Sequence, residues 1–121
     1  MCGIVGYIGE RDATPIILDG LRRLEYRGYD SAGLAVVREQ GPGFDCRRQV
    51  GKVRQLKDDV TANPVMGHTG IAHTRWATHG VPNETNAHPH ISSDRICLVH
   101  YGIIENFETL REELMAAGYV F

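Results

Sequence analysis

The chain has 121 residues, of which 42% are hydrophobic, and its formal net charge at pH 7 is −2. This length suffices for one modest domain with a soluble globular core. Basic residues form no tail or stripe of the kind that binds nucleic acid. No apolar run approaches the ~20 residues that a membrane helix needs, and no positive segment precedes the first apolar stretch as in a signal peptide.

The first third of the chain reads as a strand followed by a helix and a loop. Apolar residues 4–8 predict a short buried strand. Asp12 and Pro15 then suit the start of a helix. One face of that helix carries apolar residues at helical spacing, namely Ile17, Leu21 and Leu24. The two glycines and the Asp-Ser pair of residues 26–33 predict a loop.

The middle of the chain alternates strand and turn signals. Residues 34–37 predict a strand, which the turn-forming run 39–44 connects to a partner strand over 45–50. Apolar positions 53, 56 and 60 predict a short amphipathic helix. Residues 70–76 predict another strand, and the polar run 77–94 predicts a long loop.

The last part of the chain predicts a strand, a helix and a final strand start. The strand covers residues 95–101. Asn106 caps a helix over 107–117, whose Leu110 and Leu114 are expected to face inward and whose C′ residue is Gly118. Residues 119–121 read as the beginning of a further strand, which needs a neighbour to pair with. Strands and helices do not alternate regularly, which favours an α+β fold.

The cysteines divide into one unusual position and two ordinary ones. Cys46 and Cys97 lie in strand-like runs and are expected to be small apolar fillers. Three cysteines without metal-type spacing indicate a reducing, cytoplasmic location. Cys2 follows the initial methionine directly. Removal of Met1 would leave the Cys2 thiol beside its own α-amino group, with ordinary pKa values of ~8.5 and ~8, so that the amine can act as base for the thiol. A small buried residue at a strand start is the alternative.

Three stretches resemble a known family. "MCGIVG" resembles the opening of the class II glutamine amidotransferases, whose nucleophile is an N-terminal cysteine. "LRRLEYRGYDSAGLAVV" and "TGIAHTRWATHGVPNETNAHPH" resemble the glutamine–fructose-6-phosphate aminotransferases. Amidophosphoribosyltransferases and asparagine synthetases share the opening and differ at these two stretches. The resemblance extends over residues 1–121.

The resemblance implies a fold and an activity. The fold is the αββα sandwich of two antiparallel sheets that Ntn hydrolases share, of which residues 1–121 form the N-terminal part, as a partial glutaminase domain without the sugar-phosphate isomerase domains. The activity is hydrolysis of L-glutamine through a thioester on Cys2, with the ammonia converting fructose 6-phosphate to glucosamine 6-phosphate in the missing half. No cofactor is implied, and the full-length protein is expected to be a homodimer.

The same resemblance assigns roles to residues after the strand at 70–76. Arg75 grips the α-carboxylate of glutamine, Trp76 shields the site, and Thr78 and His79 add polar contacts. A structural ion pair for Arg75 and a core position for Trp76 are the alternatives. His79, His88 and His90 lie close in sequence, but a proline-broken loop gives them no fixed geometry, and no metal site is expected.

Tyr101 departs from the family pattern. The family has asparagine there, whose amide and the N–H of the next glycine, here Gly102, form the oxyanion hole. Loss of one such donor typically costs ~10²–10³ in rate. The aspartate that binds the α-amino group of glutamine in the family would follow residue 121. A non-catalytic remnant that at most binds glutamine or a partner subunit is therefore the alternative function.

Overall fold

The computed structural model describes residues 2–27, 30–76, 83 and 85–121. Its elements are, in chain order, β1 (Gly3–Ile8), α1 (Ala13–Leu24), η1 (Glu25–Arg27), β2 (Ser31–Val37), β3 (Phe44–Val50), α2 (Val53–Ala62), β4 (Thr69–Arg75), β5 (His90–Ser92), β6 (Ile96–Leu98) and α3 (Phe107–Ala116). None of the helices in the described part of the chain is long and apolar enough to cross a membrane.

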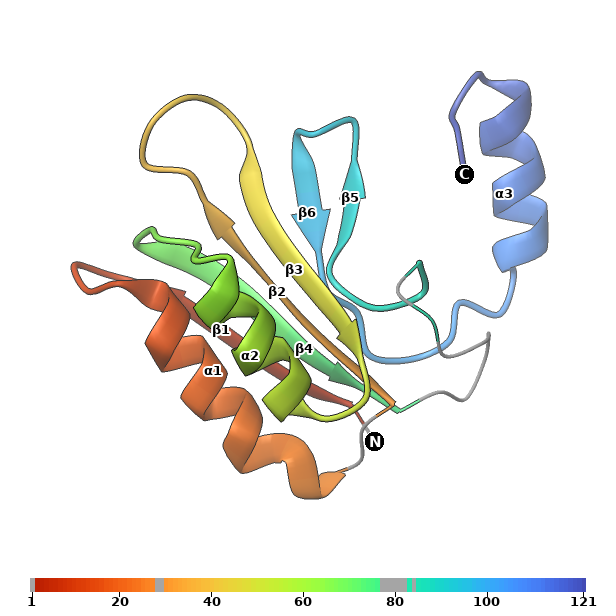
Figure 1. Cartoon of the computed structure of the whole chain (residues 1–121). Helices are drawn as coiled ribbons and strands as arrows, with labels where there is room; N and C mark the ends of the chain where they lie inside the picture. The colour runs from red at the N-terminus through yellow and green to blue at the C-terminus, as the bar shows by residue number, and fades with distance from the viewer. Residues whose placement is uncertain (1, 28–29, 77–82, 84) are drawn as a thin grey trace.

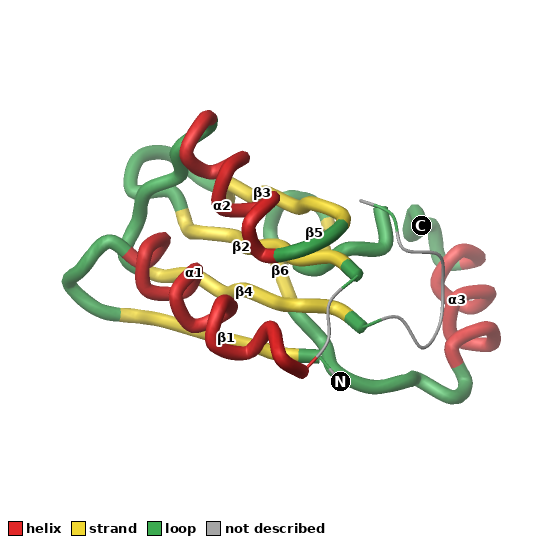
Figure 2. The backbone as a smooth tube through the Cα atoms, turned by 60° about the horizontal axis from the view of Figure 1, so that its bottom comes forward, coloured by secondary structure: helices red, strands yellow, loops and turns green. Residues whose placement is uncertain are grey.

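Two antiparallel sheets lie one behind the other. The first has four strands in the order β1-β4-β2-β3, and the second is the β5–β6 hairpin. Helices α1 and α2 lie side by side on one face of the four-stranded sheet, and the hairpin lies on the opposite side (Figures 1 and 2). The α+β fold with two antiparallel sheets is thereby confirmed.

The core lies between the two helices and the four-stranded sheet. Buried side chains at i, i+4 on α1 and at i, i+3 on α2 meet the residues that alternate along β2 and β4. The cluster comprises Ile17, Leu21, Ala32, Leu34, Val36, Val53, Leu56, Val60, Val65 and Ala72. The predicted helix faces are therefore confirmed, except that Leu24 is only partly buried.

The opposite face of this sheet, here called the inter-sheet face, carries the chemistry. Side chains alternate along a strand, and Ala72 belongs to the helix-side core. His73 and Arg75 must therefore point to the inter-sheet face. The register sets His73 between Ile4 of β1 and Gly33 of β2 on that face.

Three predicted boundaries of loops and strands were wrong. The loop expected over residues 26–33 ends earlier, because Ser31–Gly33 pair with both β3 and β4. The loop expected over 77–94 contains β5, and the strand expected over 95–101 is reduced to β6. Pairing with β3 and β4 decides the start of β2, and the three-residue strands β5 and β6 are too short to display an alternating pattern.

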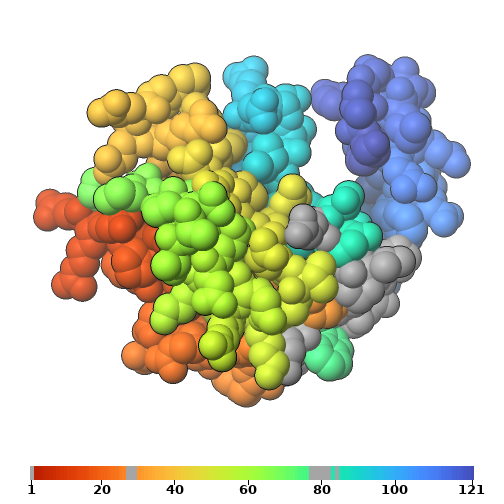
Figure 3. Space-filling model, in the orientation of Figure 1, coloured from red at the N-terminus to blue at the C-terminus, as the bar shows by residue number. Residues whose placement is uncertain are grey.

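The C-terminal helix also differs from expectation. Leu110 and Leu114 are 38% and 39% exposed, and α3 buries none of its residues. Figure 3 shows this blue segment standing apart from the β5–β6 hairpin. The predicted C′ position is confirmed: Gly118 has φ +98° and donates to the Met115 carbonyl, while the Tyr119 N–H donates to Leu114. Residues 119–121 form no strand with any described residue.

Candidate active site

Cys2 and Arg75 lie opposite each other where β1 begins and β4 ends. Gly3 pairs with Thr74, so the antiparallel register continues to Cys2 and Arg75. Both then lie on the inter-sheet face. The Cys2 Sγ lies 4.0 Å from the Trp76 carbonyl oxygen, within reach of a weak S–H hydrogen bond. The sheet thus joins the predicted nucleophile to the predicted carboxylate-binding residue.

Gly3 allows this close approach. Its N–H donates to the Thr74 hydroxyl at 3.1 Å. A Cβ on Gly3 would lie 2.8 Å from that hydroxyl oxygen and 2.9 Å from the Leu24 Cβ, which leaves room for no side chain. The glycine after the cysteine therefore holds the start of β1 tightly between β4 and α1, and the thiol position follows from that packing.

Arg75 is a buried cation at the end of β4. It is 7% exposed, and it pairs with Ser31 of β2 on the side away from β1. Its carbonyl accepts the Asp30 N–H at 2.7 Å, which fixes the backbone at this point. A buried guanidinium in water-poor surroundings interacts strongly with an anion and matches a carboxylate with two parallel hydrogen bonds.

The remaining predicted residues divide between described and undescribed positions. The Trp76 side chain is 51% exposed at the end of β4, so the core position considered for it is wrong. Thr78 and His79 lie outside the described residues. Of the predicted substrate-binding residues, the described structure therefore brings Arg75 and Trp76 together with Cys2.

The segment that leads to Gly102 is attached to β4 through His73. The His100 carbonyl lies 2.9 Å from the His73 Nε2, and His73 precedes Arg75 by one same-face step of about 7 Å on β4. The chain then continues through Tyr101, which is 52% exposed. Gly102 has φ +133°, a conformation that favours glycine. Its N–H has no acceptor among the described residues.

A histidine cluster lies beside the predicted site. The expectation that His88 and His90 have no fixed geometry was wrong, and the participation of His73 was not predicted. The rings of His73 and His88 stack at 4.1 Å, and those of His88 and His90 lie 4.3 Å apart. The His100 N–H donates to the His88 Nδ1 at 3.2 Å. The described residues contain no group of three side chains suited to hold a metal. The sequence signal for this cluster was His73, a histidine in the middle of the apolar strand predicted over residues 70–76.

The other two thiols differ from Cys2 in their surroundings. Burial raises the pKa of Cys46, which lies on β3. Burial and the neighbouring Cys46 raise the pKa of Cys97, on β6, to about 11. Both are therefore protonated and poorly nucleophilic at neutral pH, as expected for apolar fillers.

An open groove lies away from this group of residues. It runs between the β2–β3 turn and the β5–β6 hairpin and is lined by Arg38, Pro42, Gly43, Phe44, Ile91 and Asp94. Phe44 pairs with Val37 at the end of β2 that is remote from Ser31. The groove therefore lies at the other end of the sheet and takes no part in the chemistry of Cys2.

The chain matches known proteins over its whole length. No family model matches the chain. The chain is 62% identical over its whole length to the glutamine–fructose-6-phosphate aminotransferase (isomerizing) of Pseudomonas aeruginosa. It is 64% identical to the enzyme of the same name from Photorhabdus laumondii and 63% identical to that from Escherichia coli K12. In each case it spans 20% of the relative's length.

Solved structures agree with the fold. The glutamine phosphoribosylpyrophosphate amidotransferase of B. subtilis, solved with ADP and GMP, has a TM-score of 0.81 at 25% identity. The allosteric regulatory enzyme of purine biosynthesis has a TM-score of 0.83 at 24% identity. Each match covers 100% of this chain and 26% of the other. Both neighbours share the arrangement of sheets and helices described above.

Proposed function

From the premise that this chain belongs to the glutamine–fructose-6-phosphate aminotransferases, of which it matches the N-terminal fifth, we propose that it is the glutamine-hydrolysing part of such an enzyme. The observation that carries the proposal is the register of β1 and β4, in which Gly3 pairs with Thr74 and so brings Cys2 to the end of β4, where its Sγ lies 4.0 Å from the Trp76 carbonyl oxygen, next to Arg75. A nucleophile and a carboxylate-binding cation at the same end of the sheet suit the two ends of a glutamine molecule.

The chemistry begins with removal of Met1. The free α-amino group of Cys2 then takes the proton of the thiol, and the sulfur attacks the side-chain amide carbon of L-glutamine. A C–S bond forms, and negative charge collects on the amide oxygen, where the Gly102 N–H stabilises it. The amine returns the proton to the nitrogen as the C–N bond breaks and ammonia leaves. Water then hydrolyses the γ-glutamyl thioester to glutamate and regenerates the thiol.

Substrate recognition belongs to residues near the end of β4. Arg75 binds the α-carboxylate in bidentate fashion. Trp76 covers the bound substrate, and Thr78 and His79 supply polar contacts. No cofactor takes part in these steps.

The wider setting is part of the same proposal. The ammonia converts fructose 6-phosphate to glucosamine 6-phosphate in a second domain, so that residues 1–121 are a partial glutaminase domain of a homodimeric enzyme. A cytoplasmic location agrees with the three free cysteines, Cys2, Cys46 and Cys97.

Tyr101 favours a second candidate function. The resemblance requires an asparagine amide at this position, and a tyrosine hydroxyl lies several ångströms further from the backbone. A single remaining donor, the Gly102 N–H, lowers the rate of attack by ~10²–10³. In this alternative the chain is non-catalytic and binds glutamine or a partner subunit.

Covalent labelling tests the nucleophile. The chain is incubated with 6-diazo-5-oxo-L-norleucine, an electrophilic glutamine analogue, and the labelled peptide is identified by mass spectrometry. We expect one adduct, on Cys2 of chains that have lost Met1, and none in a Cys2→Ser variant. A Cys97→Ser variant is the matched control and should label like the parent. No adduct on Cys2, combined with glutamine binding in calorimetry, would support the non-catalytic alternative.

A further inference from the structure

Both backbone groups of His100 are held by imidazoles. The His100 carbonyl lies 2.9 Å from the His73 Nε2, and the His100 N–H donates to the His88 Nδ1 at 3.2 Å. Because His73 lies on β4 and stacks against His88 at 4.1 Å, one side-chain stack ties this peptide segment to the sheet. Tyr101 and Gly102 follow immediately along the chain.

The hydrogen bonds fix the tautomer of each ring. A carbonyl can only accept, so the His73 Nε2 carries a proton. The His100 N–H can only donate, so the His88 Nδ1 carries none. The stacking of the two rings is consistent with both being uncharged. The His73 Nδ1 is buried and has no hydrogen-bond partner among the described residues. A charged ring would carry a proton on this nitrogen without an acceptor, so the site suits the neutral ring.

The sheet beneath the stack is shaped to receive it. Gly33 of β2 lies directly opposite His73. A Cβ on Gly33 would overlap the carbonyl oxygen of His88. The absence of a side chain at this position lets the backbone of residue 88 rest on the inter-sheet face, and its ring then reaches both His73 and His100.

We propose that His73 and His88 are positioning residues, whose neutral imidazoles hold His100 so that the Gly102 N–H is directed at the oxygen of the reacting amide. The effect of these residues on catalysis rests on the proposed glutaminase function. The hydrogen bonds to His100 stand independently of that function. Neither imidazole touches the substrate, and each acts through the backbone of His100.

Protonation acts differently on the two rings. A proton on the His88 Nδ1 would face the His100 N–H, donor against donor, and break that bond. A proton on the His73 Nδ1 would leave the bond to the His100 carbonyl intact. Burial lowers the pKa of His73 to about 4 and that of His88 to about 3. Both rings are therefore neutral at physiological pH, and the attachment is present there.

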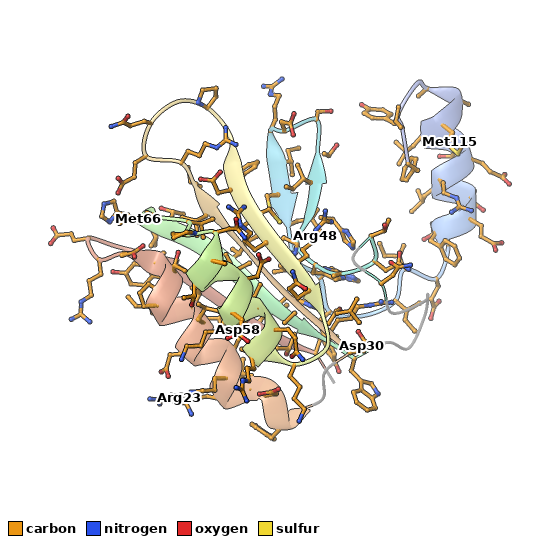
Figure 4. All side chains as sticks on the ribbon, in the orientation of Figure 1. Arg23, Asp30, Arg48, Asp58, Met66 and Met115 are labelled. Atoms are coloured by element: carbon orange, nitrogen blue, oxygen red, sulfur yellow. The ribbon has the colours of Figure 1, made fainter. Side chains whose placement is uncertain are left out.

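The charged groups around the stack come from several elements. Arg75 on β4, together with His90 on β5, lowers the pKa of both His73 and His88. His73 and His100 lower the pKa of His88 as well, whereas the hydrogen bond to the His100 carbonyl and Asp30, just before β2, raise that of His73. Burial lowers the pKa of His90, and Arg48 of β3, labelled in Figure 4, and Arg75 lower it further. Burial, which has the largest effect, and the neighbouring Arg75 thus favour the neutral rings on which the attachment depends.

Nitrogen NMR of the whole chain, isotope-labelled on histidine, tests the attachment without reference to activity. At about pH 5.5 an ordinary histidine is mostly charged. We expect His73 and His88 to remain neutral there with the proton on Nε2, and the His100 amide to exchange slowly. Charged rings, or the opposite tautomers, would overturn the proposal.

Paired substitutions test the catalytic meaning. His88→Asn keeps an acceptor near the place of Nδ1, and His73→Gln keeps a donor near the place of Nε2, whereas His88→Leu and His73→Leu remove them. We expect the leucine variants to label Cys2 with the diazoketone about 10²-fold more slowly, as for a misplaced reacting group. The amide variants should recover most of that rate. Thermal melts report whether each variant is folded.

The outcomes separate the two proposals. Leucine variants that label at the parent rate, or folded amide variants that label as slowly as the leucine ones, would overturn the positioning role. If a leucine variant does not fold, the amide variant of the same residue and the histidine NMR decide. If the parent itself forms no adduct, the proposed function fails. The attachment would still be established if the His100 amide proton exchanges slowly in the parent and fast in His88→Leu.

Discussion

At the scale of single residues, the proposed chemistry depends on what lies next to a thiol. Cys46 and Cys97 have raised pKa values because they are buried. Cys2 lies at a strand start, with its sulfur near the Trp76 carbonyl. Loss of Met1 would add an amine to the same residue, and a base beside the sulfur is what a weak nucleophile needs. The proposed chemistry therefore assigns the nucleophile to Cys2 because of its position in the chain.

Tyr101 gives the first prediction at this scale. Replacement of Tyr101 by Asn restores a side-chain donor beside the Gly102 N–H, so stabilisation of the developing oxyanion improves. We expect glutamate release, or the rate of labelling of Cys2, to rise by ~10²–10³. Tyr101→Phe is the matched control, since it keeps the ring and offers no donor. Equal rates for the parent, Asn and Phe variants would show that residue 101 does not contribute to the oxyanion hole.

The buried histidines give a prediction about pH. The folded-state pKa values of His73, about 4, and His88, about 3, lie below the ordinary ~6.5. The unfolded chain therefore binds more protons between these values, and the free energy of unfolding rises with pH there. We expect urea midpoints to be constant above about pH 7 and to fall progressively as the pH drops towards 4. His88→Asn should show a smaller fall, and an equal fall would contradict the account.

At the scale of helices and strands, elements with a strong local sequence pattern were predicted, whereas elements without one were not. Helix α1, helix α2 and the β2–β3 turn have strong local signals, namely helical spacing around Leu21 and the glycines of the turn, and all three were predicted. The start of β2 at Ser31 depends on pairing with β4, far away in the chain, and no local pattern specifies that partner. The strands β5 and β6 pair with each other nearby, but three residues are too few to show an alternating pattern, so the prediction failed there as well.

The candidate site was predicted to a similar extent. Cys2, Arg75 and Trp76 were named from sequence, and the register of β1 and β4 brings them together. The contacts of His73 and His88 with His100 were not foreseen. They join residues 12 and 27 positions apart, and a histidine in sequence does not reveal which of its nitrogens meets which backbone group.

Two leucines on different helices test the packing. Leu56 of α2 is fully buried against the sheet, whereas Leu110 of α3 is 38% exposed. Leu56→Ala leaves a cavity in the core, and we expect the free energy of unfolding to fall by about 2–5 kcal/mol. Leu110→Ala should change it by about 0.5 kcal/mol or less. A comparable loss in both variants, measured by urea denaturation, would mean that α3 packs against the rest of the chain.

At the scale of the whole molecule, the two faces of the four-stranded sheet are covered unequally. Helices α1 and α2 cover one face, and in the described part of the chain the two-stranded sheet and the segment around His88 lie over the other. Large apolar side chains are exposed on this side and beyond it, including Ile4, Ile8, Ile96, Leu98 and Ile103. Exposed apolar surface of this extent promotes association between molecules.

Association of the chain is therefore a testable consequence. We expect sedimentation velocity to show species larger than the monomer that grow with protein concentration. Ile96, on β6 and 60% exposed, is a suitable position for a charge, and Ile96→Lys should shift the chain towards the monomer. Met66→Lys, at an exposed position before β4 and labelled in Figure 4, is the control. A parent chain that stays monomeric at all concentrations would contradict the expectation.

The most direct test of the account follows the N-terminal residue during turnover. The chain, or its faster Tyr101→Asn variant, is mixed with glutamine, quenched in acid within the first turnover and digested for mass spectrometry of the first peptide. The account predicts a γ-glutamyl group on the sulfur of Cys2, only in molecules that lack Met1. Release of ammonia by molecules that retain Met1 would contradict it.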